Sequence, residues 1–170
     1  MMKTDRLLGM AAAAFALALA ACSTQAATDA PLSPAAQEAG VHPVSGLTVI
    51  PLTIISGTSG DQTHAFRVEV AASPGEQQMG LMFRTEMGAN EGMIFPLAQV
   101  RMASFWMRNT VIPLDIIFIG PDNRIINIAR DATPYSEQPI PSDAPAAAVL
   151  ELNAGRTAEL GIEAGDTVQW

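Results

Sequence analysis

Short apolar segments separated by turn residues run through the chain from residue 47 to residue 170. In one of them Phe66, Val68 and Val70 lie on one side, and the residues between them are charged, as in a half-buried strand. Many short strands of this kind predict a mainly β fold, a compact antiparallel β-sandwich or a barrel-like domain. Strands are expected at 48–56, 65–71, 93–95, 100–107, 114–119, 124–130, 147–152 and 167–170.

One or two short helices complete the expected fold. Ser73 is a good N-cap, Pro74 suits the first helical position, and Gly80 ends the helix about one turn later. A second helical turn is expected within 154–160. No strand–helix alternation is long enough to predict a parallel sheet. Residues 131–146 hold four prolines and predict a functional loop or a packed surface excursion.

The N-terminus has the features of a secretory signal. Lys3 and Arg6 precede the apolar run 7–20, which is shorter than the about 20 residues that cross a bilayer. The run closes on LAAC, with Cys22 last, and resembles the lipobox of bacterial lipoprotein precursors, in which the cysteine becomes the lipidated N-terminus. Ordinary cleavage beside an incidental cysteine is the alternative. Ser23 then resembles the pattern sorted to the outer membrane.

These features predict three regions. Residues 1–21 form the signal peptide, and residues 22–46 form the lipidated Cys22 and a flexible Ala/Pro tether, which cannot bury enough surface to fold. Residues 47–170 form a single β-rich domain. We therefore expect a cell-envelope lipoprotein that faces the periplasm, held at its membrane by the lipid anchor.

Charge and composition exclude several functions. The net charge is −8, and without residues 1–21 seven cations face sixteen acids, a net charge of −9. Nucleic-acid binding needs clustered cations, so we expect no nucleic-acid partner. One cysteine and two histidines leave no zinc-site pattern. Six methionines within 79–107 could bind Cu(I), but methionine also fills cores, and the spacing is irregular. We predict no metal and no cofactor.

Asp115 is the first candidate for a functional residue. It interrupts the otherwise apolar run 114–119, and a carboxylate there must be paired, hydrogen-bonded or neutralised. It either faces a ligand, together with the nearby Asn109 and Thr110, or accepts backbone N–H bonds and braces the loop 109–113.

Arg84 is the second candidate. A guanidinium can hold a ligand carboxylate, a phosphate or a sugar hydroxyl. The alternative is an internal ion pair with Glu69, Glu86 or Asp115.

Trp106 is the third candidate. Because Phe105 and Met107 flank it, its strand is expected to be central and its ring to lie in the core. The alternative is a stacking platform for a sugar or another flat ligand at the rim of the fold.

Four stretches of the chain carry a resemblance to a known family. They are QQMGLMFR from Gln77, EGMIF from Glu91, FWMRNT from Phe105 with IPLD after it, and VLELNAG from Val149. Together they resemble the domain of unknown function 192 family over about residues 66–170. The resemblance implies a compact, mainly β sandwich, often secreted, with no assigned activity and no catalytic residue to carry over.

Three functional classes remain. The sequence favours a non-enzymatic module that binds a small ligand or an envelope polymer. The alternatives are a purely structural or partner-binding lipoprotein and an acid–base hydrolase that uses Asp115. No nucleophile motif or cofactor loop supports an enzyme. The predicted ligand-binding residues are Arg84, Trp106, Asn109, Thr110 and Asp115.

Overall fold

The computed structural model describes residues 40–57 and 62–170 of the 170-residue chain. The predicted signal peptide, Cys22 and the tether up to residue 39 lie outside these described residues. Within them, no helix is both long enough and apolar enough to cross a membrane.

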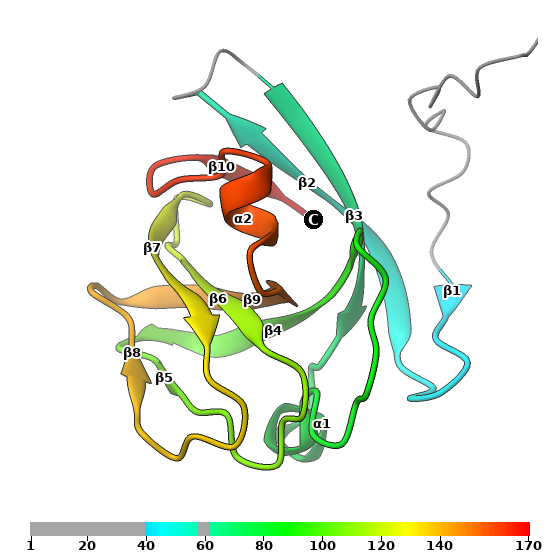
Figure 1. Cartoon of the computed structure of the whole chain (residues 1–170). Helices are drawn as coiled ribbons and strands as arrows, with labels where there is room; N and C mark the ends of the chain where they lie inside the picture. The colour runs from blue at the N-terminus through cyan, green and yellow to red at the C-terminus, as the bar shows by residue number, and fades with distance from the viewer. Residues whose placement is uncertain (1–39, 58–61) are drawn as a thin grey trace, which may run out of the picture. The chain divides into compact units, whose positions relative to one another are not determined.

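The domain is mainly β with two short helices, as predicted (Figure 1). The described strands are β1 (Gly40–Val41), β2 (Thr48–Ser56), β3 (Gln62–Val70), β4 (Glu91–Arg101), β5 (Ser104–Phe105), β6 (Leu114–Ile119), β7 (Ile125–Ala132), β8 (Ile140–Pro141), β9 (Ala146–Asn153) and β10 (Thr167–Gln169). The helices are α1 (Pro74–Met79) and α2 (Arg156–Glu159).

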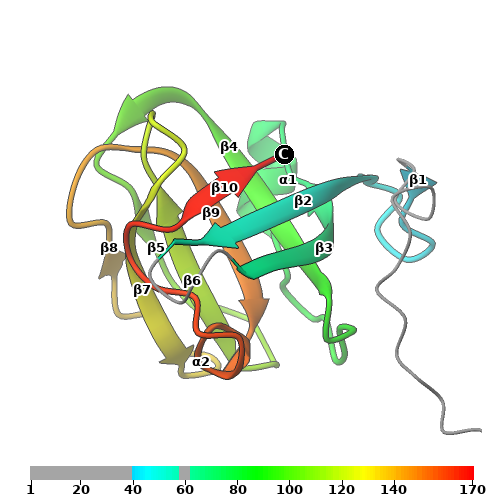
Figure 2. The ribbon, with the colours of Figure 1, turned by 90° about the horizontal axis from the view of Figure 1, so that it is seen from above.

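Eight strands form one sheet in the order β1-β2-β3-β4-β9-β6-β7, with β10 paired to β2. The sheet curls on itself, and Figure 2 shows β10 beside β2 from above. A single bridge between Arg124 and Thr167 joins the two ends of the curl, so the sheet approaches a barrel without closing. Strands β5 and β8 pair separately.

One strand pair is parallel, contrary to the wholly antiparallel prediction. β3 and β4 run in the same direction, and the connection 71–90 between them contains α1. This connection is long enough for a crossover, which a parallel pair requires. It starts with a capping box, in which Ser73 Oγ accepts from the Glu76 N–H and the Glu76 carboxylate accepts from the Ser73 N–H. The sheet is therefore mixed.

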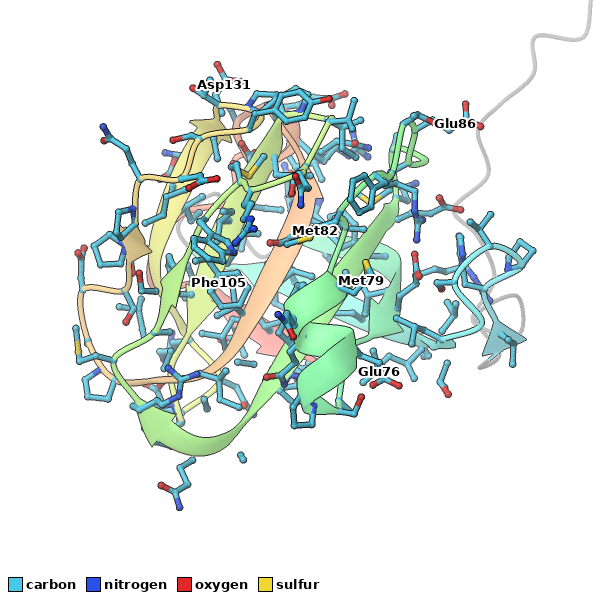
Figure 3. The ribbon with its side chains drawn as sticks, turned by 90° about the horizontal axis from the view of Figure 1, so that it is seen from below. Glu76, Met79, Met82, Glu86, Phe105 and Asp131 are labelled. Atoms are coloured by element: carbon cyan, nitrogen blue, oxygen red, sulfur yellow. The ribbon has the colours of Figure 1, made fainter. Side chains whose placement is uncertain are left out.

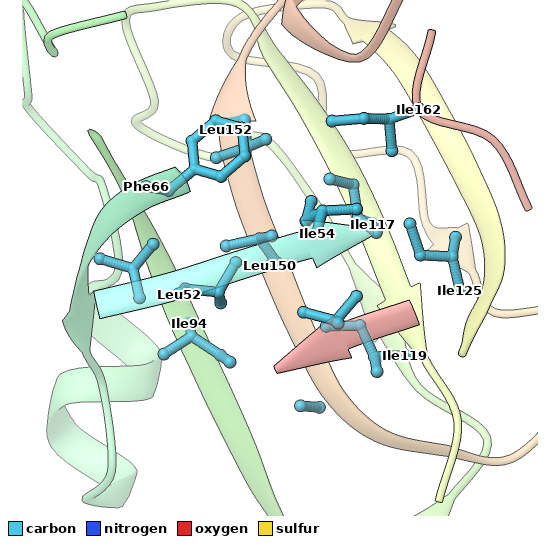
Figure 4. Close-up of a cluster of buried hydrophobic side chains, with 13 residues drawn as sticks. Leu52, Ile54, Phe66, Ile94, Ile117, Ile119, Ile125, Leu150, Leu152 and Ile162 are labelled. Atoms are coloured by element: carbon cyan, nitrogen blue, oxygen red, sulfur yellow. The ribbon is translucent and has the colours of Figure 1, made fainter. Parts of the chain in front are cut away.

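Two apolar clusters pack against opposite faces of β6 and β9. Ile117 and Leu150 belong to the first cluster, which Figure 4 shows. Their neighbours Ile116 and Val149 belong to the second cluster, because consecutive strand residues point to opposite faces. Burial on both faces explains why the run 114–119 is almost continuously apolar.

The folded part begins earlier than the predicted residue 47. Residues 40–46, here called the N-terminal arm, include β1, which pairs with β2. Ser45 Oγ donates to the Glu69 carboxylate, and His42 Nε2 lies 3.7 Å from Glu69 Oε1. Strand alternation in the sequence predicts that Glu69 faces solvent. The N-terminal arm covers its side chain instead, and Glu69 is buried.

Candidate functional site

Three loops meet at the end of the sheet near α1, at the lower end of Figure 1. They are residues 80–90 after α1, 106–113 after β5 and 133–139 after β7. Backbone hydrogen bonds join them, and the Phe83 N–H donates to the Asn109 carbonyl at 2.9 Å. The loops therefore form one connected unit.

These loops contain residues in an unusual backbone conformation. Phe83, Asn109 and Tyr135 have φ angles of 63°, 55° and 62°. A positive φ is strained for a bulky side chain, and such strain gathers at functional sites. The Tyr135 N–H donates to the Thr110 carbonyl at 3.2 Å, so the strained residues belong to the bonded loop unit.

A pocket of about 230 Å³ opens between α1, the loops 80–90 and 106–113 and strands β4, β5 and β9. Figure 3 shows Met82 on one side of β9 and Phe105 on the other. The centre of the Phe105 ring lies 5.1 Å from the centre of the Phe95 ring and 6.2 Å from that of Phe118, and both contacts are edge-on. This packing fixes one apolar wall of the pocket. We call this hollow the Glu151 pocket, after its buried polar residue.

Glu151 is 5% exposed and lies on β9. It stands opposite Met93 of β4 and Ile116 of β6, both fully buried in the second apolar cluster. Its carboxyl group makes no hydrogen bond or ion pair with any described residue. Because Glu151 lines the pocket wall, its carboxyl group is available to a ligand there.

Burial raises the pKa of Glu151 to about 8. Desolvation disfavours the charged carboxylate, and no paired cation offsets it. The side chain is therefore mostly an uncharged carboxylic acid at neutral pH. In that form it can donate a hydrogen bond to a ligand oxygen. A carboxyl group perturbed in this way in a cleft is a feature of functional sites.

Trp106 lies on the rim of the Glu151 pocket and is 47% exposed, so the prediction of a core tryptophan is wrong. The expected strand 100–107 is interrupted, and β5 ends at Phe105. Met107 turns into the core, and the Trp106 ring is left outside. The guanidinium of Arg108 stands 5.6 Å from the ring centre, as in a cation–π contact.

Asp115 lies fully inside the protein and accepts four hydrogen bonds. Its Oδ1 accepts from the backbone N–H groups of Asp131 at 3.0 Å and Gly155 at 3.1 Å. Its Oδ2 accepts from Thr157 N at 3.0 Å and Thr157 Oγ1 at 2.7 Å. Asp115 therefore braces the end of β7 and the start of α2, and the bonds do not go to the predicted loop 109–113.

Arg84 forms an internal ion pair with Glu69, which was the alternative to its predicted role in ligand binding. Its Nη2 lies 2.8 Å from Glu69 Oε1, and its Nη1 lies 3.4 Å from His42 Nε2. It borders a second hollow of about 630 Å³ beside the N-terminal arm. There the Glu91 carboxylate accepts from the Gly88 N–H, so Glu91, like Arg84, already has a partner within the protein.

The predicted ligand-binding residues thus separate into two groups. Trp106 and Thr110 line the Glu151 pocket. Arg84, Asn109 and Asp115 do not, and the Asn109 amide points to the Met82 sulfur at 3.7 Å.

Glu151 itself was not among the predicted site residues. It interrupts the apolar run 147–152 in the same way that Asp115 interrupts 114–119. The same argument, that a carboxyl inside an apolar strand needs a reason, would have selected it.

The six methionines do not form one cluster, although Met79, Met82 and Met87 border the same hollow beside the N-terminal arm. Met93 and Met107 are buried in the core, whereas Met79 and Met102 are more than half exposed. Within residues 40–57 and 62–170, no group of three His, Cys, Asp or Glu residues is placed to hold a metal ion.

The family model DUF192, described as "Uncharacterized ACR", matches residues 55–170. A crystal structure of a protein of unknown function from Novosphingobium aromaticivorans DSM 12444 is 55% identical, with a TM-score of 0.77, and the match covers 83% of this chain and 100% of that chain. A protein from Sinorhizobium meliloti 1021, described as a proposed transcription regulator, is 39% identical with a TM-score of 0.67, over 70% of this chain and 91% of that chain. No protein with a curated description matches.

Proposed function

The chain belongs to the domain of unknown function 192 family, and we propose that its domain is a non-enzymatic small-ligand binding module of the cell envelope. The ligand lies in the Glu151 pocket, between the exposed Trp106 ring and the buried carboxyl of Glu151. The buried Glu151 side chain in the wall of this pocket, together with the exposed Trp106 ring at its rim, is the observation that carries this proposal.

The contrast with Asp115 supports this reading of Glu151. Both carboxyl groups are buried on strands, but Asp115 accepts four hydrogen bonds and holds the fold together. Glu151 makes no such bonds to the described residues, and its burial makes the charged form of the carboxyl group costly. A group that costs stability and faces a pocket is better explained by ligand binding than by folding.

The shape of the Glu151 pocket favours a small, flat ligand. Its volume of about 230 Å³ is small beside the cavities that hold drug-sized molecules. Trp106 and Phe105 offer aromatic surface on which a single ring, a sugar or an aromatic group, can stack. An acid–base hydrolase built on Asp115 is not supported, because that carboxylate is engaged inside the protein.

Calorimetric titration of the full chain tests the proposal with single-ring probes, namely glucose, N-acetylglucosamine, benzyl alcohol and benzoate. At least one should bind saturably, and Trp106→Ala should weaken that binding by about tenfold or more, as loss of an aromatic anchor does. The matched control is Trp170→Ala, which removes an exposed tryptophan outside the pocket and should leave the affinity unchanged. Equal affinities for wild type and Trp106→Ala would contradict the proposal.

The module is further proposed to be a periplasm-facing lipoprotein, attached to the outer membrane through Cys22. The lipobox-like LAAC run and the tether after it support this location. The net charge of −9 after removal of residues 1–21 disfavours nucleic acid. For that reason the role suggested for the Sinorhizobium protein is not transferred to this chain.

Cells that express the chain and are fed a radioactive fatty acid should label it, because Cys22 is proposed to become the lipidated N-terminus. Cys22→Ala should abolish the label, and Ser23→Ala is the control that keeps it. Equal label in wild type and Cys22→Ala would refute the anchor without touching the pocket.

A further inference from the structure

We infer that the ligand of the Glu151 pocket is a small organic anion, a single-ring carboxylate, selected by Arg101 and Arg108 at the edge of the pocket. The inference rests on the proposed function and adds the charge of the ligand to it. Its basis is the distribution of charge around this one pocket.

Arg101 and Arg108 give the pocket its cations. Arg101 is the last residue of β4, and Arg108 follows β5, so two separate segments bring a guanidinium to the same hollow. Both side chains are exposed and can reorient. This pairing of cations stands out in a chain whose net charge is −8.

Neither guanidinium is held in a strong ion pair. Arg108 approaches Glu137 at 4.0 Å, with both side chains more than half exposed, and such surface pairs contribute little. Arg101 Nη1 donates to the Met102 carbonyl at 3.2 Å, which satisfies one of its five N–H groups. Arg108 also stands over the Trp106 ring, but both guanidinium groups keep N–H donors that can hold a carboxylate, the group that matches their planar fork.

No acid neutralises these cations from within the pocket. Among the described residues that line it, the one acid is Glu151, and its carboxyl group is uncharged at neutral pH. From α1 the pocket receives Gln77 and Gln78, which carry no charge, and across β6 Glu151 faces the apolar Ile116. An anion entering the pocket meets two positive charges and a hydrogen-bond donor.

The opposite charge on a ligand would be disfavoured for the same reason. A cation of equal size would meet Arg101 and Arg108 without a compensating carboxylate. A neutral ring would keep its contact with Trp106 but gain nothing from the guanidinium groups. The charge of the ligand should thus decide affinity among molecules of one shape.

Benzoate, benzamide and benzamidine test this directly, because they share one ring and nearly one shape but carry charges of −1, 0 and +1. Titration calorimetry on the full chain at pH 7 should rank them in that order, with benzoate about tenfold tighter than benzamide, which corresponds to one charge-assisted contact. Arg101→Gln and Arg108→Gln should each weaken benzoate and leave benzamide unchanged. Arg124→Gln, an exposed arginine outside the pocket, is the control.

The pH dependence provides a second readout. Benzoate keeps its charge between pH 7 and pH 9, whereas Glu151 loses its proton, so benzoate should bind the wild type about tenfold more weakly at pH 9. Glu151→Gln keeps a hydrogen-bond donor and cannot ionise, so its affinity for benzoate should not change over this range.

The outcomes separate the inference from the proposed function. If benzamide binds as tightly as benzoate, or benzamidine binds best, the pocket binds ligands but the anionic class is refuted. If the Arg101 and Arg108 variants bind benzoate like the wild type, the inference also fails. Absence of binding by all three probes overturns the inference, and the sugar titrations then decide the proposed function separately.

Discussion

Replacing Asp115 with asparagine is expected to lower the free energy of unfolding by about 3–5 kcal/mol. The carboxylate accepts from Asp131, from Gly155 and twice from Thr157. An amide offers one acceptor oxygen and turns an NH₂ group toward the remaining donors. Two of the four donors therefore lose their acceptor inside the protein, where water cannot replace it.

Urea unfolding of the full chain measures this effect. Asp143→Asn is the matched control, because Asp143 is exposed. The free energy of unfolding of this variant should stay within about 0.5 kcal/mol of that of the wild type. Arg84→Met should show no coupling to Asp115→Asn in a double-mutant cycle, since Arg84 pairs with Glu69. A loss of less than about 1 kcal/mol on Asp115→Asn would contradict the bracing role.

The stability of the wild type is expected to fall by about 3 kcal/mol more than that of Glu151→Gln between pH 5 and pH 8. Burial raises the pKa of Glu151 from 4.5 to about 8 in the folded protein. Over this range the unfolded chain releases a proton that the folded chain keeps. The free energy of unfolding is thus unaffected by Glu151 below pH 4.5, falls as the pH rises and the buried carboxyl group is forced to ionise, and levels off above about pH 8.

Chemical unfolding at several pH values gives both curves. Glu86→Gln is the control, because Glu86 is exposed and does not line the Glu151 pocket, and its stability should follow that of the wild type. The free energy of unfolding of Glu151→Gln should fall less steeply with pH than that of the wild type or of Glu86→Gln. Parallel curves for wild type and Glu151→Gln, within about 1 kcal/mol, would show that Glu151 is ionised in the folded protein.

The strands and helices could be predicted from local patterns because periodicity and capping act over a few residues. The capping box at Ser73 and the alternation around Phe66 are examples, and α1 and β3 lie at those places. Which strands pair is a non-local property. No residue near β3 or β4 encodes their parallel pairing, which depends on how the connection 71–90 packs.

The candidate site was only partly predictable for the same reason. The carboxylate of Asp115 in an apolar run predicted burial and hydrogen bonding, but its donors lie 16 to 42 residues away in sequence. Apolar neighbours predicted a buried Trp106, because they do not reveal that β5 ends one residue earlier. The apolar run 147–152 could have selected Glu151 as a candidate, but that Glu151 lines a pocket follows only from the fold.

The most direct test of ligand binding in the Glu151 pocket is a crystal of the protein soaked in benzoate. The account predicts density for one ring between Trp106 and Glu151, with its carboxylate within hydrogen-bond distance of Arg101 or Arg108. An empty Glu151 pocket at saturating benzoate, or benzoate bound only elsewhere, for example in the hollow beside Arg84, would contradict it.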